Sequence, residues 1–551
     1  MPDPLPDPLP DPLPDPLPRG PASPRVLVVG AGFGGIAVAI ALKRAGATDL
    51  SVLEARDGVG GVWRDNAYPD CACDVPAPLY SYSFALNPSW SRRYPPAAEI
   101  RDYLEDVVDR FDVRRHVRLG VEVESARWDE DRQVWTVRTA SGAEHECDVL
   151  VSAVGQLSRA RTPDLPGAGS FAGRVVHSTG WGPDVEVTGR RVAVVGAGAS
   201  AIQIVPAIAD TARSVTVFQR SAPWTLPKPD RRYGRLRRAL VRRAPRLLLA
   251  GRGVTWAVTS TMGLAVTGNA VLARTLAAAS ALQRRVQVRD PELRRKVTPG
   301  YPMGCKRVLF TSRWYPTLMR DDVDLVTERI EGFGERGLRT ADGVEHEADL
   351  VVLATGFTAT DLLAPMTVRG RGGRLLADEW ADGARAHLGL TVPGFPNLFL
   401  VYGPNTNTGN SSVVYFHESQ ARYIAQGYRL LAALGGGSME VREDVEAAYD
   451  REIQDRLSGS VWTACASWYR NAAGRVVTNW PGMAGEYRRR TARLDPADYL
   501  VRPPVLEPEP VPEPVPVPEP VPVPEPVPVP EPAEPVVADL RGPGRAADRR
   551  S

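Results

Sequence analysis

The sequence predicts an α/β fold built from two doubly wound parallel sheets. Two glycine-rich stretches carry this prediction: RVLVVGAGFGG at 25–35 and RVAVVGAGASA at 191–201. In each, a β-branched apolar run enters a glycine turn that opens a helical stretch. The two halves also end alike, with DVLVSAVG at 148–155 and DLVVLATG at 349–356. Short strands alternating with helices indicate βαβ units, so we expect an internal duplication in which one domain interrupts the other.

The domain boundaries follow from this duplication and from shifts in composition. The first domain is expected in two segments, the second domain lies between them, and a linker joins the two. A segment rich in Arg, Leu and Ala is predicted to form a helical insertion in the second domain. The expected ranges are 25–160 and 349–500 for the first domain, 161–189 for the linker, 190–348 for the second domain and 231–297 for the insertion.

Proline-rich tails flank these domains at 1–24 and 501–551. The first tail repeats PDPL, and the second carries PEPVPV units at 507–532. Proline at every second or third position forbids helix and sheet and favours extended polyproline II. We therefore expect disordered linkers, with docking segments for a proline-reading partner as the alternative.

Composition limits the partners of the chain. Its 551 residues carry 67 Lys and Arg against 65 Asp and Glu, and a net charge of +2 gives no reason to expect nucleic acid. Five scattered cysteines indicate reduced thiols rather than a disulfide framework. The start shows no signal peptide, so a cytoplasmic location is expected. No metal site is expected.

One uncharged stretch, 253–273, bears on membrane association. It is rich in Thr, Gly, Ser and Asn, so its transfer into lipid gains little. A buried helix is expected rather than a span. The arginines of the surrounding insertion are interpreted as a solvated face.

The first glycine loop predicts a dinucleotide site. Gly30 permits a tight turn, Gly32 lets backbone approach a pyrophosphate, and Gly35 lets the helix pack close to its strand. The helix N-terminus offers unpaired N–H groups to the phosphates. The next strand ends on Glu54, 22 residues after Gly32, where a carboxylate accepts from ribose hydroxyls.

The second loop predicts a site for a different dinucleotide. Gly196 and Gly198 occupy the first two glycine positions, and Ser200 lies in the same turn. Counting 22 residues from Gly198 reaches Arg220, whose counterpart in the first half is Glu54. A guanidinium pairs with a 2′-phosphate that a carboxylate would repel, so this site suits NADP. A surface ion pair is the alternative for Arg220.

Two dinucleotides in one chain imply electron transfer between them, most economically FAD in the first site and NADPH in the second. The loop GVGGVW at 58–63, with Gly61 and Trp63, then falls where it could serve a flavin, although the glycine loops alone do not decide which site binds the flavin. A disulfide reductase is a rival reading, but it needs a redox cysteine pair. The chain offers only CAC at 71–73, whose single spacer makes a strained, uncommon pair.

The segment between the loops carries a resemblance to a known family. FAGRVVHSTGW at 171–181 resembles the fingerprint F-x-G-x-x-x-H-x-x-x-W-P/D of type I Baeyer–Villiger monooxygenases, with Gly182 in the last position. Further matches are GCKR at 304–307, GFPNLFLVYGPNT at 394–406 and WPG at 480–482. The similarity covers about residues 25–500. The fingerprint residues are Phe171, Gly173, His177 and Trp181.

The resemblance implies a reaction. Such enzymes use NADPH, FAD and O₂ to insert one oxygen beside a ketone carbonyl, through a flavin C4a-peroxide, and give an ester or lactone. The developing negative charge needs a fixed cation in a dry site. By resemblance, Arg307 supplies that cation, and Asp74 holds Arg307 and tunes flavin reduction. An interdomain salt bridge is the alternative for both residues.

The resemblance also assigns supporting residues. Lys306 matches a residue that reaches the 2′-phosphate, and Gln203 matches an NADP contact more loosely. Trp480 resembles a tryptophan that contacts NADP on closure, with a core aromatic as the alternative. His177 is expected to be structural, in a linker that couples the two domains.

Two other functions stay open at this point. The same cofactor cycle could oxygenate amine nitrogen or sulfide sulfur, or the chain could hold cofactors without productive catalysis. The ketone itself cannot be read from the sequence, although the insertion hints at a bulky, apolar one.

Overall fold

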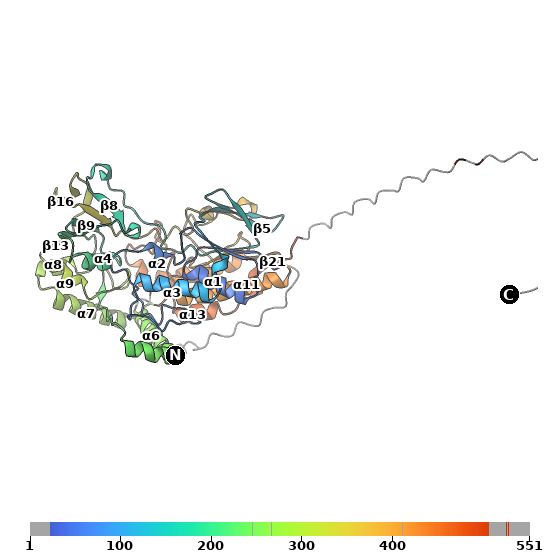
Figure 1. Cartoon of the computed structure of the whole chain (residues 1–551), viewed down its shortest axis with the longest axis horizontal. Coiled ribbons are helices and arrows are strands. Elements are labelled where there is room, and N and C mark those ends of the chain that lie inside the picture. Colours follow the sequence, from blue (N-terminus) through green and yellow to red (C-terminus); the bar gives the residue numbers. More distant parts are fainter. Residues whose placement is uncertain are drawn as a thin grey trace, which may run out of the picture. The chain divides into compact units, whose positions relative to one another are not determined.

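The structure is a computed structural model that describes residues 23–244, 246–265, 267–409 and 411–505, together with Glu525 and Val527 (Figure 1). The prediction of disordered Pro-rich tails therefore falls almost wholly outside the described residues. Within 23–505 the chain is an α/β fold, as expected. None of its described helices is long and apolar enough to cross a membrane.

The first glycine loop belongs to a five-stranded parallel sheet in the order β19-β7-β1-β2-β3. Its strands are β1 (Val26–Val29), β2 (Leu50–Glu54), β3 (Val117–Leu119), β7 (Val149–Ser152) and β19 (Leu398–Leu400). Strands β1 and β7 are buried along their whole length. This matches their unbroken apolar runs, because a parallel sheet is covered on both faces.

Helix α1 (Phe33–Arg44) follows the first loop and packs beside α11 (Val413–Ala433) (Figure 1). Every α1 residue from Phe33 to Leu42 is buried. A helix that is apolar all round belongs in a core, which explains why IAVAIAL carries no charge. Helix α11, from the far end of the chain, therefore belongs to the first glycine-loop unit.

The second glycine loop belongs to a similar parallel sheet in the order β13-β10-β9-β17-β8. Its strands are β8 (Arg174–His177), β9 (Arg191–Val195), β10 (Ser214–Phe218), β13 (Val323–Val326) and β17 (Leu350–Leu353). Helix α4 (Ala201–Ile208) follows the loop.

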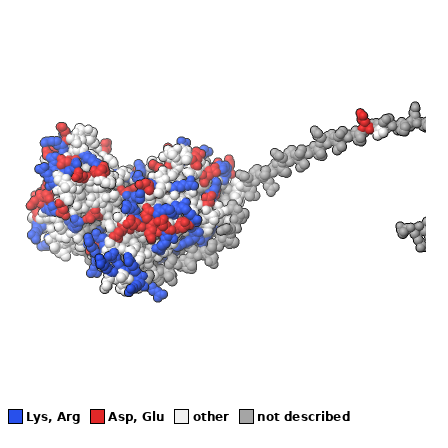
Figure 2. All heavy atoms as spheres, viewed as in Figure 1, with Lys and Arg blue, Asp and Glu red and all other residues white. Residues whose placement is uncertain are grey.

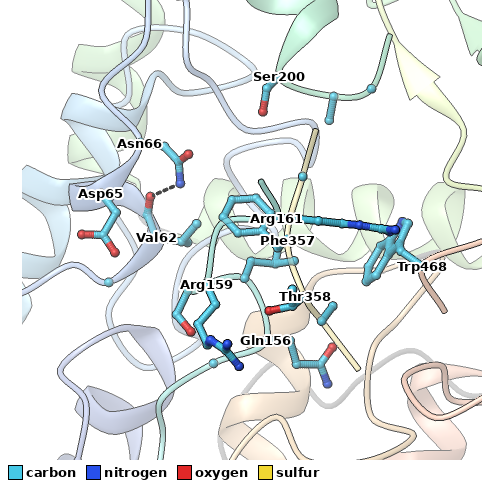
Figure 3. A pocket seen from close by; sticks show the side chains of 18 of the residues that line it. Val62, Asp65, Asn66, Gln156, Arg159, Arg161, Ser200, Phe357, Thr358 and Trp468 are labelled. Carbon is cyan, nitrogen blue, oxygen red and sulfur yellow. Dashed lines mark hydrogen bonds between the residues drawn. The ribbon is translucent and has the colours of Figure 1, made fainter. Parts of the chain in front are cut away.

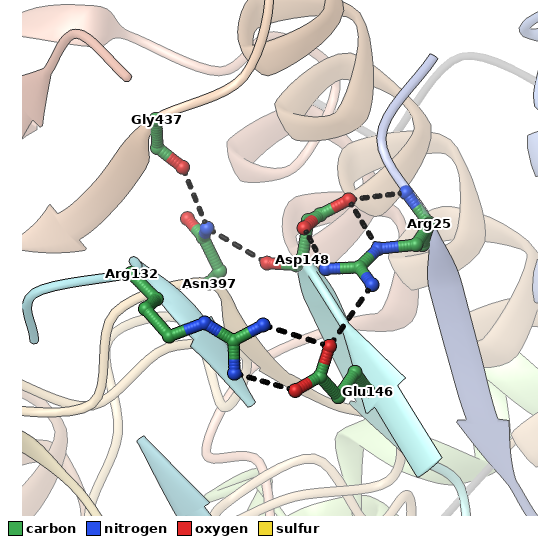
Figure 4. Close-up of polar contacts among 6 residues, drawn as sticks. All are labelled: Arg25, Arg132, Glu146, Asp148, Asn397 and Gly437. Atoms are coloured by element: carbon green, nitrogen blue, oxygen red, sulfur yellow. Dashed lines mark hydrogen bonds and ion pairs between the residues drawn. The ribbon is translucent and has the colours of Figure 1, made fainter. Parts of the chain in front are cut away.

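The predicted duplication extends to an ion-pair cluster at the base of each sheet. In the first half, the Arg25 backbone N–H and guanidinium both donate to Asp148, and the guanidinium also reaches Glu146 (Figure 4). In the second half, Arg191 makes the same set of bonds to Asp349 and Glu347. Each cluster ties the strand before a glycine loop to the strand that ends its half.

Each parallel sheet is accompanied by a smaller, mainly antiparallel one. Strands β4 (Val123–Asp129), β5 (Val134–Thr139) and β6 (Glu144–Cys147) accompany the first, with β18 (Thr367–Arg369) paired parallel to β4. Strands β14 (Ile330–Phe333), β15 (Gly337–Thr340) and β16 (Glu345–Glu347) accompany the second. The same strand–helix–meander plan is thus used twice.

Three boundaries differ from the expected ones. Residues 350–353, expected to begin the second segment of the first domain, form β17 between β9 and β8 of the second sheet. Part of the expected linker, 174–177, is the edge strand β8 of that sheet. The expected tail begins inside β21 (Tyr499–Arg502), which pairs with β20 (Ser438–Val441). Pairing between distant strands decides all three, and local sequence does not report it.

The insertion is helical, as predicted: α5 (Arg235–Arg243), α6 (Arg246–Leu264), α7 (Ala270–Gln287) and α8 (Pro291–Lys296). The expectation of a buried helix at 253–273 is wrong in part. This stretch spans the end of α6, a turn and the start of α7, and Val254 is 67% exposed.

The remaining elements are short or peripheral. They are helices α2 (Val62–Asp65), α3 (Ala97–Arg110), α9 (Trp314–Leu318), α10 (Leu376–Glu379), α12 (Glu443–Ser458) and α13 (Ala484–Arg490), the strand pair β11 (Thr225–Leu226) and β12 (Leu309–Phe310), and single 3₁₀ turns at Arg114–His116, Ala168–Ser170, Ser178–Gly180, Arg371–Gly373, Val461–Thr463 and Pro496–Asp498.

Candidate active site

A cavity of about 1210 Å³ brings the two glycine loops together. Its lining includes Gly30 and Gly32 of the first loop and Gly196 and Gly198 of the second. Figure 3 shows Val62, Asp65 and Asn66 on one side, Ser200 on another and Trp468 on a third. Segments from 29 to 468 in sequence therefore converge on one space.

The first loop is shaped for close approach. Gly30 has φ +103°, and a Cβ there would lie 2.6 Å from the Ala153 carbonyl oxygen. A Cβ on Gly35 would lie 1.8 Å from the Gly30 carbonyl oxygen. Helix α1 has neither a side-chain cap at Gly32 nor an acidic residue in its first turn. Its N-terminus is therefore a suitable cradle for a pyrophosphate.

Glu54 lies at the end of β2, beside this loop. It is 7% exposed, and each of its carboxylate oxygens accepts a backbone bond: from Ala31 N–H at 2.7 Å and from Arg56 N–H at 2.9 Å. These bonds fix the carboxylate at the cavity wall, where a ribose of a dinucleotide held by the loop would sit.

The GVGGVW loop packs directly on the first glycine loop. The Gly60 N–H donates to the Ala31 carbonyl at 3.0 Å, and a Cβ on Gly61 would lie 3.1 Å from the Gly32 Cα. The Trp63 indole N–H donates to the Tyr80 hydroxyl at 3.0 Å, and both side chains line the cavity. Gly61 and Trp63 thus lie on the cavity wall beside the first glycine loop.

The second loop repeats the geometry of the first. Gly196 has φ +125°, and a Cβ there would lie 2.4 Å from the Ala354 carbonyl oxygen. A Cβ on Gly198 would meet nothing within 4 Å, which leaves open space over the loop. Ser200 stands just before α4 and lines the cavity.

Arg220 and Lys306 form a pair of cations on the cavity wall beside the second loop. Burial lowers the pKa of Lys306, and the nearby positive charge of Arg220 lowers it further. The Lys306 ammonium donates to the Ser221 hydroxyl at 3.0 Å. Within the described part of the chain, no carboxylate pairs with either cation. Two adjacent cations without a counter-ion make an anion site that fits a phosphate.

The side-chain amide of Gln203 is hydrogen-bonded to the backbone of Ala72. Its amide nitrogen donates to the Ala72 carbonyl at 3.0 Å, and its amide oxygen accepts from the Ala72 N–H at 3.2 Å. It lines the cavity but its amide joins α4 to the segment that carries Asp74.

Arg307 and Asp74 form a two-pronged ion pair within the same cavity. The Arg307 Nε donates to Asp74 Oδ2 at 2.9 Å, and Nη2 donates to Oδ1 at 2.8 Å. The charge of Asp74 is the main reason that the pKa of Arg307 is raised. The Arg307 side chain remains 40% accessible, and it lines the cavity. Its remaining guanidinium surface is therefore available to a bound molecule.

Tyr402 and Tyr469 lie near Arg307, and the sequence did not single them out. Tyr402 donates to Asn407 Oδ1 at 2.8 Å and packs edge-on against His417. Burial lowers the pKa of His417 to about 3, and neither ring nitrogen has a partner among the described residues. Burial also raises the pKa of Tyr469 to about 12. These buried rings come from segments far apart in sequence, so only the folded structure reveals them.

The cysteine prediction is wrong for two of the five residues. Cys305 and Cys465 form a disulfide across 160 residues of sequence, whereas Cys71, Cys73 and Cys147 are free and buried. The bond joins the loop of Arg307 to the segment of Trp468. The prediction failed because spacing in sequence says nothing about two cysteines brought together by the fold.

Cys71 and Cys73 are not a redox pair. Burial raises the pKa of Cys71 to about 11 and raises that of Cys73 further. Such thiols are poor nucleophiles. The described residues also hold no cluster of His, Cys, Asp and Glu able to bind a metal.

The fingerprint lies at the edge of the second sheet. Phe171 packs on Phe333, and His177 ends β8 opposite Leu353, with its Nδ1 accepting from the Thr179 N–H at 3.2 Å. A Cβ on Gly173 would lie 2.6 Å from the Asp349 carbonyl oxygen, and Trp181 is buried. None of these four lines the cavity. His177 is therefore away from the candidate chemistry.

Trp480 also lies away from the cavity. It is 2% exposed, packs at 5.3 Å on Tyr487 and donates to the Met483 carbonyl at 3.2 Å. The described conformation favours a core aromatic, and contact with a cofactor would require this packing to open.

Comparison with known proteins places the chain among related oxidoreductases. Residues 27–243 match the family model described as pyridine nucleotide-disulphide oxidoreductase. A Baeyer-Villiger monooxygenase of Streptomyces coelicolor is 43% identical over 483 residues, which are 87% of this chain and 93% of that protein. One from Pseudomonas aeruginosa is 38% identical, over 86% of this chain and 91% of that protein.

Solved structures agree. An oxidized steroid monooxygenase bound to NADP is 34% identical, with a TM-score of 0.78 over 87% of this chain and 99% of that one. A cyclohexanone monooxygenase from Rhodococcus sp. Phi1 bound to NADP⁺ is 27% identical, with a TM-score of 0.78 over 88% of this chain and 100% of that one.

Proposed function

Because the chain belongs to the Baeyer–Villiger monooxygenases, we propose that its cavity carries out their reaction with the Arg307–Asp74 pair at its centre. The protein is an FAD- and NADPH-dependent monooxygenase that inserts one oxygen atom of O₂ beside a ketone carbonyl. The relatives do not favour oxygenation of nitrogen or sulfur as its main activity. What remains to be assigned is the role of each residue.

We assign FAD to the first glycine loop. Gly30, Gly32 and Gly35 would hold its pyrophosphate, and Glu54 would accept from its ribose. Gly61 and Trp63 lie beside the first loop on the cavity wall and would contact the flavin part. The observation that supports this assignment is the close backbone packing at Gly30 and Gly35, where any side chain would collide with the backbone.

We assign NADPH to the second loop. Gly196, Gly198 and Ser200 would hold its pyrophosphate, and Arg220 and Lys306 would clamp its 2′-phosphate. Gln203 would act indirectly, by holding the Ala72 backbone near Asp74. When bound, the two cofactors supply the electrons and the oxygen activation that the reaction needs.

The central observation is the Arg307–Asp74 pair inside a cavity that both loops line. Arg307 holds a permanent positive charge where negative charge would develop on the reacting oxygens, and a cation fixed in place by its ion pair stabilises such a transition state. Asp74 is a positioning residue, because it occupies one edge of the guanidinium and fixes its plane. A lysine would be a weaker choice, since it loses its proton more readily when buried.

Substitution of Arg307 tests this assignment. Arg307→Ala should retain FAD but lose ester formation by at least about 100-fold, which is the usual cost of removing one preorganised charge stabiliser. Arg313→Ala is the matched control, since Arg313 pairs with Asp70 and does not line the cavity. Ester formation retained by the Arg307 variant, or lost equally by the control, would remove Arg307 from the mechanism.

We propose a bulky, apolar ketone and O₂ as substrates and the cytoplasm as the location. The aromatic walls near Arg307 support an apolar ketone. The cytoplasm keeps most thiols reduced, which fits the three free cysteines but not the Cys305–Cys465 disulfide. Alkylation of thiols in intact cells, followed by mass analysis of Cys305 and Cys465, tests whether the enzyme carries its disulfide there.

A further inference from the structure

The helical insertion carries charged side chains of one sign over most of its length. Between residues 231 and 289 the sequence has 13 arginines and no Asp or Glu. Within the described part of the chain, only Arg252 among these arginines forms an ion pair, with Glu418. In Figure 2, blue and white spheres cover the lower edge of the molecule, where Figure 1 places α6. Nearly all of this charge thus lacks a counter-ion.

The same surface exposes apolar side chains in an ordered way. On α6, Leu247, Val254 and Val258 are 46%, 67% and 51% exposed, and their spacings of seven and four residues put them on one face. The opposite face of α6 buries Arg252 and Trp256. The usual amphipathic arrangement is therefore inverted, with the apolar stripe turned outward.

The neighbouring helices α5 and α7 also expose apolar side chains. Leu236 and Leu240 on α5 are four residues apart, as are Leu282 and Val286 on α7, and all four are exposed. With Leu247, Val254, Val258, Leu264 and Val271, the insertion holds nine of the sixteen exposed large hydrophobic residues in the described part of the chain. This concentration of exposed apolar side chains in one insertion indicates a binding surface.

We propose that α5, α6 and α7 dock the enzyme onto the surface of an anionic lipid bilayer. Leucine and valine side chains enter the boundary between headgroups and acyl chains, and arginines bind the lipid phosphates. This replaces the interpretation of the arginines as a solvated face. The helices lie on the bilayer, since no described helix can span it.

The charge of the surface separates this occupant from others. A second copy of the chain would bring two acid-free arginine clusters together, which repel each other. A nucleic acid would pair with the arginines but would leave the apolar stripe in water. An anionic bilayer satisfies both features at once.

The position of a small apolar groove fits this occupant. The groove, about 300 Å³, is lined by Ala265, Ala273 and Ala277 of the insertion, by Pro302 and Met303, and by Val461. Met303 is four residues from Arg307 in sequence. The docking surface therefore adjoins the loop that carries the candidate active site.

Sedimentation of the full-length, FAD-loaded enzyme with vesicles tests the proposal. Vesicles of phosphatidylcholine with phosphatidylglycerol should bind at least about tenfold more protein than vesicles of phosphatidylcholine alone. Val254→Glu with Val258→Glu should abolish that excess. Arg235→Glu with Arg243→Glu should reduce it about tenfold, since both side chains are exposed and without ion pairs.

The matched control is Val344→Glu with Leu500→Glu, both 47% exposed and outside the insertion, which should bind as the wild type does. NADPH oxidation by each variant confirms folding. Equal binding to both vesicle types, or normal binding by the Val254 and Val258 variant, would overturn the proposal. If vesicle binding is absent, either of two results would also overturn the proposal. One is DNA binding that depends only on the arginines, and the other is a dimer that Val254→Glu with Val258→Glu dissociates.

Discussion

The pair Arg220 and Lys306 gives the sharpest quantitative prediction, because NADPH and NADH differ only in the 2′-phosphate that these cations would bind. A charge-assisted hydrogen bond contributes about 1.5–3 kcal/mol, and the lower end applies to Arg220, which is exposed. Arg220→Ala should therefore weaken NADPH binding about tenfold, since about 1.4 kcal/mol is one factor of ten. NADH binding should stay within about twofold.

The double variant carries more information than either single one. Arg220 depresses the pKa of Lys306, so its removal also relieves repulsion and strengthens what Lys306 contributes. Loss of both side chains should then differ from the product of the two single losses, as expected for neighbouring residues. The assay is the dissociation constant of each dinucleotide, from flavin fluorescence during titration. Equal losses for NADPH and NADH, or no loss for NADPH, would refute the assignment of the phosphate site.

Three further predictions use other parts of the molecule. The pKa of Lys306 lies below the usual 10.5, and a bound phosphate would raise it. NADPH affinity should therefore fall as the pH rises through this lowered pKa, because the ammonium loses its proton, whereas NADH affinity should not change. A parallel fall for both dinucleotides would contradict the phosphate site. Cys465→Ser, or reduction with dithiothreitol, should lower the free energy of unfolding by about 2–5 kcal/mol in chemical denaturation, because the disulfide closes a long loop. A Cys147→Ser control should respond to dithiothreitol as the wild type does, since Cys147 is free. If dithiothreitol leaves the unfolding free energy of the wild type unchanged, the Cys305–Cys465 disulfide is contradicted. Glu54→Gln leaves one backbone N–H at the first loop without its acceptor, so the free energy of FAD binding should weaken by about 1–3 kcal/mol. The loss of flavin absorbance from the protein after dilution and filtration measures this. Full retention of the flavin would contradict a role for Glu54 in FAD binding.

The glycine loops were predictable because their chemistry is local. Gly30 and Gly196 are needed at positions where backbone turns sharply against the next strand, and the residues around them carry the whole signal. Glu54 and Arg220 followed by counting along a repeated unit. The same reasoning found the helical insertion, since an Arg-, Leu- and Ala-rich stretch favours helix.

What the sequence did not reveal depends on contacts between distant segments. The Cys305–Cys465 bond, the placement of β17 in the second sheet and the approach of Tyr402 and Tyr469 to Arg307 all join residues far apart in the chain. Arg307 and Asp74 were predicted from the resemblance to a family, because no spacing of residues in this sequence points to them. The resemblance also named Trp480, which lies in the core of the described conformation.

The central claim is that this cavity converts a ketone to an ester with an oxygen atom from O₂. Its most direct test is a panel of apolar ketones with NADPH under ¹⁸O₂, with products analysed by mass spectrometry. The account predicts an ester or lactone that gains one ¹⁸O atom, in step with NADPH consumption. Consumption of NADPH that yields only hydrogen peroxide, or oxygenated amines and sulfides without any ester, would contradict it.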